Sequence, residues 1–151
     1  MKNRRQFLKG TLLGALGTFL LPKAFKKSTR YKTNAHSQVG FSMVISTWKH
    51  GLAANESAMQ ILNNGGVAID AVEQGVRVSE ADPECLSVGY GGLPDRDGFV
   101  TLDASIMDHK GNCGSVSYLE HIKHPISVAR KLMDETPHVM LSGKGALKFA
   151  L

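Results

Sequence analysis

The residue types that could do chemistry are concentrated in residues 82–108, where a glycine-dense turn leads into a segment of alternating polar and apolar residues. Its glycines could present backbone amides to an anion, or they could only allow tight packing of the backbone. A phosphate-binding loop would continue with Lys and then Ser or Thr at the start of a helix, whereas a strand is expected here. Two interpretations therefore stay open, a turn that lines a pocket and a turn that packs closely. The turn is Ser87-Val88-Gly89-Tyr90-Gly91-Gly92.

Possible metal ligands and nucleophiles are present, but they form no recognisable signature. Residues 95–98 read Asp-Arg-Asp-Gly and lack the glutamate and further oxygen ligands of a calcium loop, so we expect a solvated turn. His121 and His124 have no third or fourth ligand at a suitable spacing. Cys85 and Cys113 could form one disulfide bond, but two separate small buried or half-buried residues are the favoured interpretation. We therefore expect no metal and no other cofactor.

The net positive charge of the chain comes from its first quarter. The 151 residues carry a net charge of +5, yet residues 1–37 contain nine Lys or Arg and no acidic residue. Residues 38–151 therefore contain nine basic and thirteen acidic residues, a net charge of −4. The basic stripe with interleaved aromatic residues that nucleic-acid binding requires is absent from this part. We expect one domain at 38–151 and no nucleic-acid partner.

Residues 1–37 have the features of an export signal. Paired arginines at Arg4 and Arg5 precede an apolar stretch from Thr11 to Leu21, which is too short to cross a bilayer. The segment resembles a twin-arginine signal followed by a spacer, and cleavage could follow Ser37. A short membrane-anchoring or buried helix is the alternative. The resemblance implies a periplasmic protein.

Local signals divide residues 38–151 into alternating helices and strands. Asn55 is a typical helix cap, Pro83 cannot continue a helix, and Pro125 is favoured at a first helical position. Lys110-Gly111-Asn112 predicts the turn of an antiparallel hairpin, so we expect an α+β fold in which helices cover a sheet. In chain order we expect a buried strand at 41–48, helices at 56–63 and 68–81, strands from 99 and at 113–119, a helix from 125, a short strand at 138–141 and a helix from 146.

Four blocks spread over residues 41–151 together resemble one known family. They are Ile45–Trp48 with Gly51-Leu52 and Ala54-Asn55, Gly65–Arg77, Asp82–Asp108, and His124–Leu141. They resemble the α-subunit of the glycosylasparaginases. The related isoaspartyl peptidases and plant-type asparaginases typically have His-Gly-Gly-Ala-Gly and Phe-Asn-Ala-Gly where this chain has Ser46-Thr47-Trp48 and the glycine turn. These differences favour the glycosylasparaginases, and the isoaspartyl peptidase branch is the alternative. Leu93 departs from the arginine that bacterial relatives often have.

The resemblance implies the first part of an N-terminal-nucleophile hydrolase, whose complete fold would be a four-layer αββα sandwich. Such an enzyme cleaves its own chain before a threonine, and the threonine hydroxyl then attacks the substrate amide. The family's His-Asp-Thr-Ile-Gly type of cleavage motif does not occur in this sequence. We therefore expect the threonine nucleophile beyond Leu151, no catalytic residue among these 151, and an inactive chain when it is alone.

The resemblance transfers only two site residues. Trp48 matches the tryptophan that lines the family's substrate pocket, and Ser87 lies near the active site, so both are predicted to bind substrate. Trp48 could instead anchor the core. The family's arginine and aspartate that clamp the substrate have no counterpart, and residues 95–97 do not take those roles. The implied partners are a small glycosylated asparagine or asparagine derivative and a C-terminal β-subunit, in a dimer of αβ dimers; the contrasting hypothesis is a non-enzymatic periplasmic binding domain that is complete at Leu151.

Overall fold

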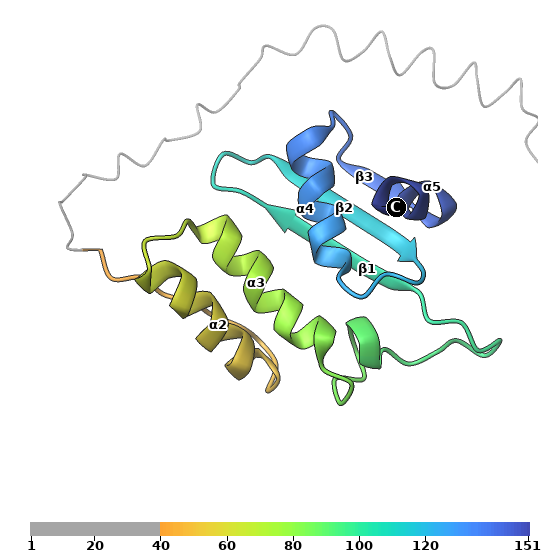
Figure 1. Cartoon of the computed structure of the whole chain (residues 1–151), viewed down its shortest axis with the longest axis horizontal. Helices are drawn as coiled ribbons and strands as arrows, with labels where there is room; N and C mark the ends of the chain where they lie inside the picture. Colours follow the sequence, from red (N-terminus) through yellow and green to blue (C-terminus); the bar gives the residue numbers. More distant parts are fainter. Residues whose placement is uncertain (1–39) are drawn as a thin grey trace, which may run out of the picture. The chain divides into compact units, whose positions relative to one another are not determined.

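The computed structural model describes residues 40–151 (Figure 1), so the predicted export signal at 1–37 lies outside the described residues. Mixed helices and strands confirm the α+β class. None of the helices in this part of the chain is long and apolar enough to span a membrane. In chain order the elements are α2 (Gly51–Asn63), α3 (Ala68–Ala81), the 3₁₀ helix η2 (Gly89–Gly91), β1 (Leu102–Met107), β2 (Cys113–Leu119), α4 (Pro125–Glu135), β3 (Met140–Ser142) and α5 (Gly143–Ala150).

The three strands form one mixed sheet in the order β1-β2-β3. The predicted hairpin is confirmed, because β1 and β2 pair antiparallel, while β3 pairs parallel with β2. Asp108 closes the hairpin turn by accepting the backbone N–H groups of Lys110 and Asn112 at 2.8 and 2.9 Å. The register shifts opposite Asp103, where β2 bulges with the two residues Ser117 and Tyr118, and the Asp103 carboxylate accepts the backbone N–H of Tyr118 at 2.8 Å. The sequence therefore encodes this hairpin locally, in its turn and in its bulge.

The hydrophobic core lies between one face of the sheet and the helices α4 and α5 (Figure 1). Strand alternation supplies one side of this core, because every second residue of β1, and of β2 as far as Val116, faces the helices. Gly114 allows α4 to approach closely, since a Cβ there would collide with the carbonyl oxygen of Ala129. Next to α4 lies α3, and α2 packs on α3. The buried core residues are Ile106, Val116, Leu119, Ile126, Val128, Ala129 and Ala146.

Several predicted elements have the expected bounds. Helix α3 covers residues 68–81 as predicted, and its C-cap, Asp82, directly precedes Pro83. Helix α4 begins at Pro125 as predicted, and it buries Ile126 and Leu132. Gly65 has a φ of 81°, which supports its predicted place after a helix end. In these segments the local signal and the tertiary contacts agree.

The predicted buried strand at 41–48 is wrong. Residues 40–46 have no regular secondary structure, and Trp48 and Ile45 are 73% and 81% exposed. The composition indicated β propensity, but a strand also needs a hydrogen-bonded neighbour, and β1-β2-β3 is the sheet that these residues would have to join. The exposure also argues against Trp48 as a core anchor.

Four element starts also differ from prediction, and one of them is β3, which begins at Met140 rather than 138. Asn55 lies inside α2, which begins at Gly51, and His50 occupies the cap position. A Cβ on Gly51 would collide with the side chain of Ser46, so glycine is needed where this helix starts. Helix α5 begins at Gly143 rather than 146, and β1 begins at Leu102 rather than 99. A capping residue type marks only a possible helix start, and both α2 and α5 begin earlier in the chain than predicted.

Candidate functional site

Two neighbouring cavities lie around the C-terminal half of α3. The first has a volume of about 290 Å³ and lies between the glycine turn, β1 and the start of α4; Ser87, Gly89 and Asp103 are among its lining residues. The second has a volume of about 350 Å³ and is lined by residues 45–48 together with α2 and α3. Val76 and Val88 line both cavities. The fold thus brings the two predicted site residues, Trp48 and Ser87, into adjacent cavities rather than into one.

The glycine turn packs closely against the end of α3. Gly89 has a φ of 59°, and a Cβ on it would collide with the backbone of Glu80. A Cβ on Gly91 would lie 2.5 Å from the carbonyl oxygen of Pro83. Ser87, at the start of the turn, is exposed, with its hydroxyl 3.8 Å from the thiol of Cys85. Both interpretations of the turn therefore hold, because it packs closely and Gly89 also lines a cavity.

A carboxyl and an imidazole meet beside the first cavity. The side chain of Glu80 is 3% exposed, its Oε1 accepts the backbone N–H of Ile126 at 2.9 Å, and its Oε2 lies 3.3 Å from Nδ1 of His124. Burial raises the pKa of Glu80 to about 7, although the hydrogen bond from Ile126 and the charge of Arg77 oppose the rise. Burial also lowers the pKa of His124, and the charges of Arg77 and Lys123 lower it further. At neutral pH, Glu80 therefore carries its proton for a substantial part of the time, and His124 is predominantly neutral.

Sequence analysis missed Glu80 as a functional candidate. The available signal was its position, because Glu80 follows Val76 by four residues and so continues the stripe of α3 that faces the core. His50 was also missed; its Nδ1 lies 3.0 Å from the hydroxyl of Ser79 and connects the start of α2 to the end of α3. Both contacts place polar groups next to the cavities.

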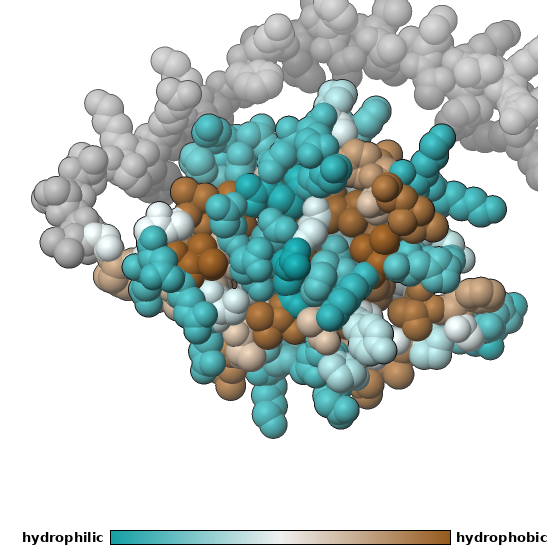
Figure 2. Space-filling view, in the orientation of Figure 1, coloured by the Kyte–Doolittle hydropathy of each residue, from teal (hydrophilic) through white to brown (hydrophobic). Residues whose placement is uncertain are grey.

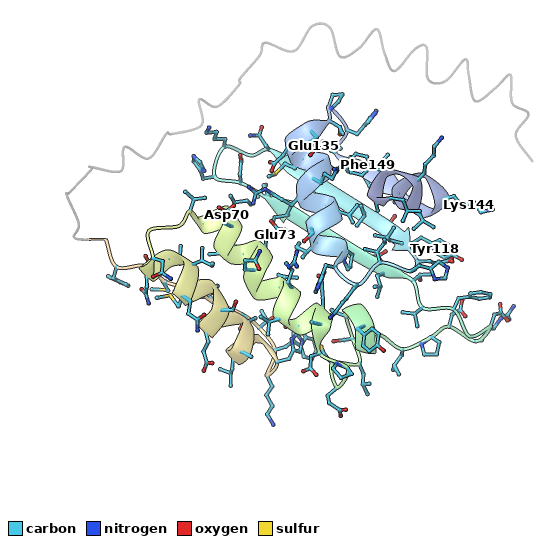
Figure 3. All side chains as sticks on the ribbon, viewed as in Figure 1. Asp70, Glu73, Tyr118, Glu135, Lys144 and Phe149 are labelled. Carbon is cyan, nitrogen blue, oxygen red and sulfur yellow. The ribbon has the colours of Figure 1, made fainter. Side chains whose placement is uncertain are left out.

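An ion-pair network holds α3 against α4. Arg130 lies 2.9 Å from Asp70, 3.5 Å from Glu73 and 2.6 Å from Asp134. Figure 3 shows Asp70 and Glu73 along α3, the helix that runs beside α4. Burial alone would lower the pKa of Arg130, but the hydrogen bonds to Asp134 and Asp70 raise it. In addition, the Ser127 hydroxyl donates to Glu73 at 2.7 Å, so the two helices that position Glu80 and His124 are tied together along their length.

The other polar candidates do not converge on a site. Asp95 accepts the backbone N–H groups of Asp97 and Phe99, which makes residues 95–98 a self-capped turn as predicted. His121 is exposed and lies 3.5 Å from Glu120, away from the pairing of His124. Between residues 40 and 151 no group of three or more His, Cys, Asp or Glu side chains is placed to hold a metal ion. Cys85 is buried, Cys113 is half-buried, and both are free thiols.

The chain is an α+β domain whose glycine turn lies beside two cavities. Comparison with known proteins identifies its family. A family model described as "Asparaginase" (Asparaginase_2) matches residues 41–151. The chain therefore belongs to this asparaginase family, which confirms the resemblance seen in the sequence.

Individual relatives give the comparison more detail. The N(4)-(beta-N-acetylglucosaminyl)-L-asparaginase of Elizabethkingia miricola is 52% identical over 99% of this chain and 43% of its own length. The rat protein of the same name is 44% identical over 72% of this chain and 32% of its own length. The rat isoaspartyl peptidase/L-asparaginase is 48% identical over 60% of this chain and 27% of its own length. The chain thus spans less than half the length of these relatives.

Proposed function

We propose that residues 38–151 are the first part of an amidohydrolase that cleaves the side-chain amide of asparagine derivatives, with N4-(β-N-acetylglucosaminyl)-L-asparagine as substrate. The observation that carries this proposal is the 52% identity to a protein of that name over 99% of the chain. The geometry supports it, because the fold brings Trp48 and Ser87 into adjacent cavities.

The proposed chemistry is covalent, and its nucleophile is a threonine beyond Leu151. The threonine hydroxyl attacks the carbonyl carbon of the side-chain amide, the amine leaves, and water hydrolyses the resulting β-aspartyl ester. Hydrogen-bond donors would stabilise the oxyanion of each tetrahedral intermediate. In this scheme the residues of the present chain bind substrate: Trp48 supplies an apolar wall and Ser87 a hydroxyl.

The complete enzyme would have a four-layer αββα sandwich, and it would become active by cleaving itself before the threonine. One face of the sheet packs on helices, and its other face is exposed at Asp103, Ser105 and Met107. This exposed face supports the proposal, because a second sheet could pack on it. In the same proposal the cleaved α- and β-subunits pair, and two αβ units form the assembly. The paired arginines Arg4 and Arg5 and the short apolar stretch after them support twin-arginine export to the periplasm.

The test is an activity assay of the full-length polypeptide with glycosylasparagine as substrate. We expect release of aspartate by the full-length protein and none by residues 1–151 alone. Trp48→Ala should raise KM about tenfold because it removes the apolar wall, whereas Trp48→Phe should keep KM within about threefold. An inactive full-length protein, or turnover by the 151-residue chain after contaminants are removed, contradicts the proposal.

A second candidate is an isoaspartyl peptidase/L-asparaginase activity. The 48% identity over 91 residues to the rat protein of that name favours it. The same preparation should therefore be assayed with a β-aspartyl dipeptide and with L-asparagine. We expect kcat/KM to be highest for glycosylasparagine; a higher value for the dipeptide would assign the second activity instead.

A further inference from the structure

The buried carboxyl of Glu80 joins three elements at the wall of the first cavity. Its backbone lies under Gly89, so closely that a Cβ on Gly89 would collide with it. Its Oε1 accepts a hydrogen bond from the backbone N–H of Ile126, in the first turn of α4. The remaining oxygen, Oε2, and the Nδ1 of His124 are both buried and without a hydrogen-bond partner in residues 40–151, and they lie 3.3 Å apart.

One proton between Oε2 and Nδ1 would satisfy both atoms. A neutral imidazole has one ring nitrogen that accepts, and a protonated carboxyl has one oxygen that donates. The alternative, in which the carboxyl is ionised and buried without a donor at Oε2, carries a large desolvation cost. The surrounding charges are Arg77 and Glu73 on α3 and Lys123 before α4, and the pKa of Glu80, raised by burial to about 7, agrees with a retained proton.

Glu80 lines the first cavity, and the turn that it supports begins with Ser87. Loss of the shared proton would remove the bond between α3 and the start of α4 that involves Oε2. The glycine turn rests on the same residue, so its position relative to α4 depends on this contact. A change at Glu80 would therefore reach the cavity without any contact between Glu80 and the reacting atoms.

We propose that Glu80 and His124 share one proton in a clasp that fixes the Ser87–Gly92 turn against α4, and that Glu80 is thereby a positioning residue for substrate binding. The kinetic consequence rests on the proposed amidohydrolase function, whereas the shared proton does not. Glu80→Gln is the informative variant, because its amide oxygen can still accept from Ile126 and its amide nitrogen, which does not titrate, can donate to Nδ1 of the neutral imidazole.

The kinetic experiment compares the full-length wild type with Glu80→Gln from pH 5.5 to 8.5. Because the wild-type clasp loses its proton as the pH rises, the ratio of kcat/KM for Glu80→Gln to that for wild type should rise from about 1 to about 10. Glu80→Ala should raise KM about fivefold or more with kcat little changed, because only binding geometry is lost. His121→Ala is the control, with a profile that follows wild type. A ratio that does not change with pH overturns the proposal.

Infrared difference spectroscopy of the full-length protein tests the clasp separately. We expect the C=O stretch of a protonated carboxylic acid at pH 6, its loss by pH 8.5, and its absence in Glu80→Gln. If no preparation hydrolyses the amide, the proposed function fails while the infrared band still decides whether the proton is held. If turnover is observed but the band is missing, the clasp fails and the function stands. The infrared test also decides the matter if Glu80→Ala does not fold.

Discussion

Two regions of this chain contain similar apolar residues and bury them to opposite extents. In the first region, where α4 packs on the inner face of the sheet and on α3, Leu132 is 0% exposed. In the second region, which is the margin formed by residues 41–52, Leu52 is 67% exposed on α2, next to the exposed Trp48. Apolar surface also shows among hydrophilic side chains in Figure 2, for example over α5.

The difference lies in the partners that each region has. Between the sheet and α4, each apolar face meets another apolar face, and the ion pairs of Arg130 close the edge between α3 and α4. Residues 45–48 of the margin line a cavity together with residues of α2 and α3 and with Val88. Single exposed apolar residues are ordinary, but several within twelve residues indicate a surface that binds something. We call the first region the junction: it buries its apolar residues, whereas the margin leaves Trp48 and Leu52 exposed.

The largest effect should come from shortening a leucine in each region. Leu132→Ala should lower the free energy of unfolding by about 3 kcal/mol, because it leaves a cavity in a packed core. Leu52→Ala is the matched control, in another helix, and should cost less than about 1 kcal/mol. Urea unfolding of the 151-residue chain measures both. Equal losses would show that the margin is packed as tightly as the junction.

The junction should also lose stability as the pH rises. The pKa of Glu80 is raised to about 7 from an ordinary value of 4.5, so between these two values the folded state binds more protons than the unfolded state. Its contribution is complete below about pH 4.5 and is lost as the pH rises through about 7, by about 2 to 3 kcal/mol. The lowered pKa of His124 acts oppositely below its ordinary 6.5, which reduces the net change. Unfolding measured from pH 5 to 8 should show a decline that Glu80→Gln removes.

A methyl group should distinguish the close approach in the junction from open space. Gly114→Ala should cost about 2 kcal/mol, because the new Cβ meets the backbone of α4. Gly145→Ala is the control; nothing lies within 4 Å of its added Cβ, and alanine is the better helix former, so it should stabilise by about 0.5 kcal/mol. Thermal unfolding should move the two midpoints in opposite directions. A destabilising Gly145→Ala would contradict the contrast.

The smallest effect concerns two adjacent ion pairs on α4. Arg130→Ala should cost about 1 kcal/mol, because Arg130 is largely covered and contacts three carboxylates. Lys131→Ala breaks only an exposed pair with Glu135 and should change stability by less than about 0.3 kcal/mol. Repeating the measurement at 1 M salt should reduce the difference. An equal cost for both would mean that the network does not hold α3 and α4 together.

The sequence predicted the elements whose signals are local. Pro83 and Pro125 mark helix bounds through chemistry that acts within one or two residues, and the turn at 110–112 determines its hairpin. Residues 41–48 could not be predicted in this way, because β propensity says nothing of whether a neighbouring strand is present. Of the candidate site, Trp48 and Ser87 came from family resemblance. The meeting of Glu80 with His124, 44 positions later, depends on how two helices pack.

The bulge of β2 opposite Asp103 helps to select the register in which β1 and β2 pair. Sliding β1 by one residue along β2 would turn Ile106 toward water and Ser105 toward the helices. The same slide would withdraw the Asp103 carboxylate from the amide of Tyr118. The turn and the Asp103 contact that select this register lie within eighteen consecutive residues, and the burial of Ile106 against α4 then stabilises the same register.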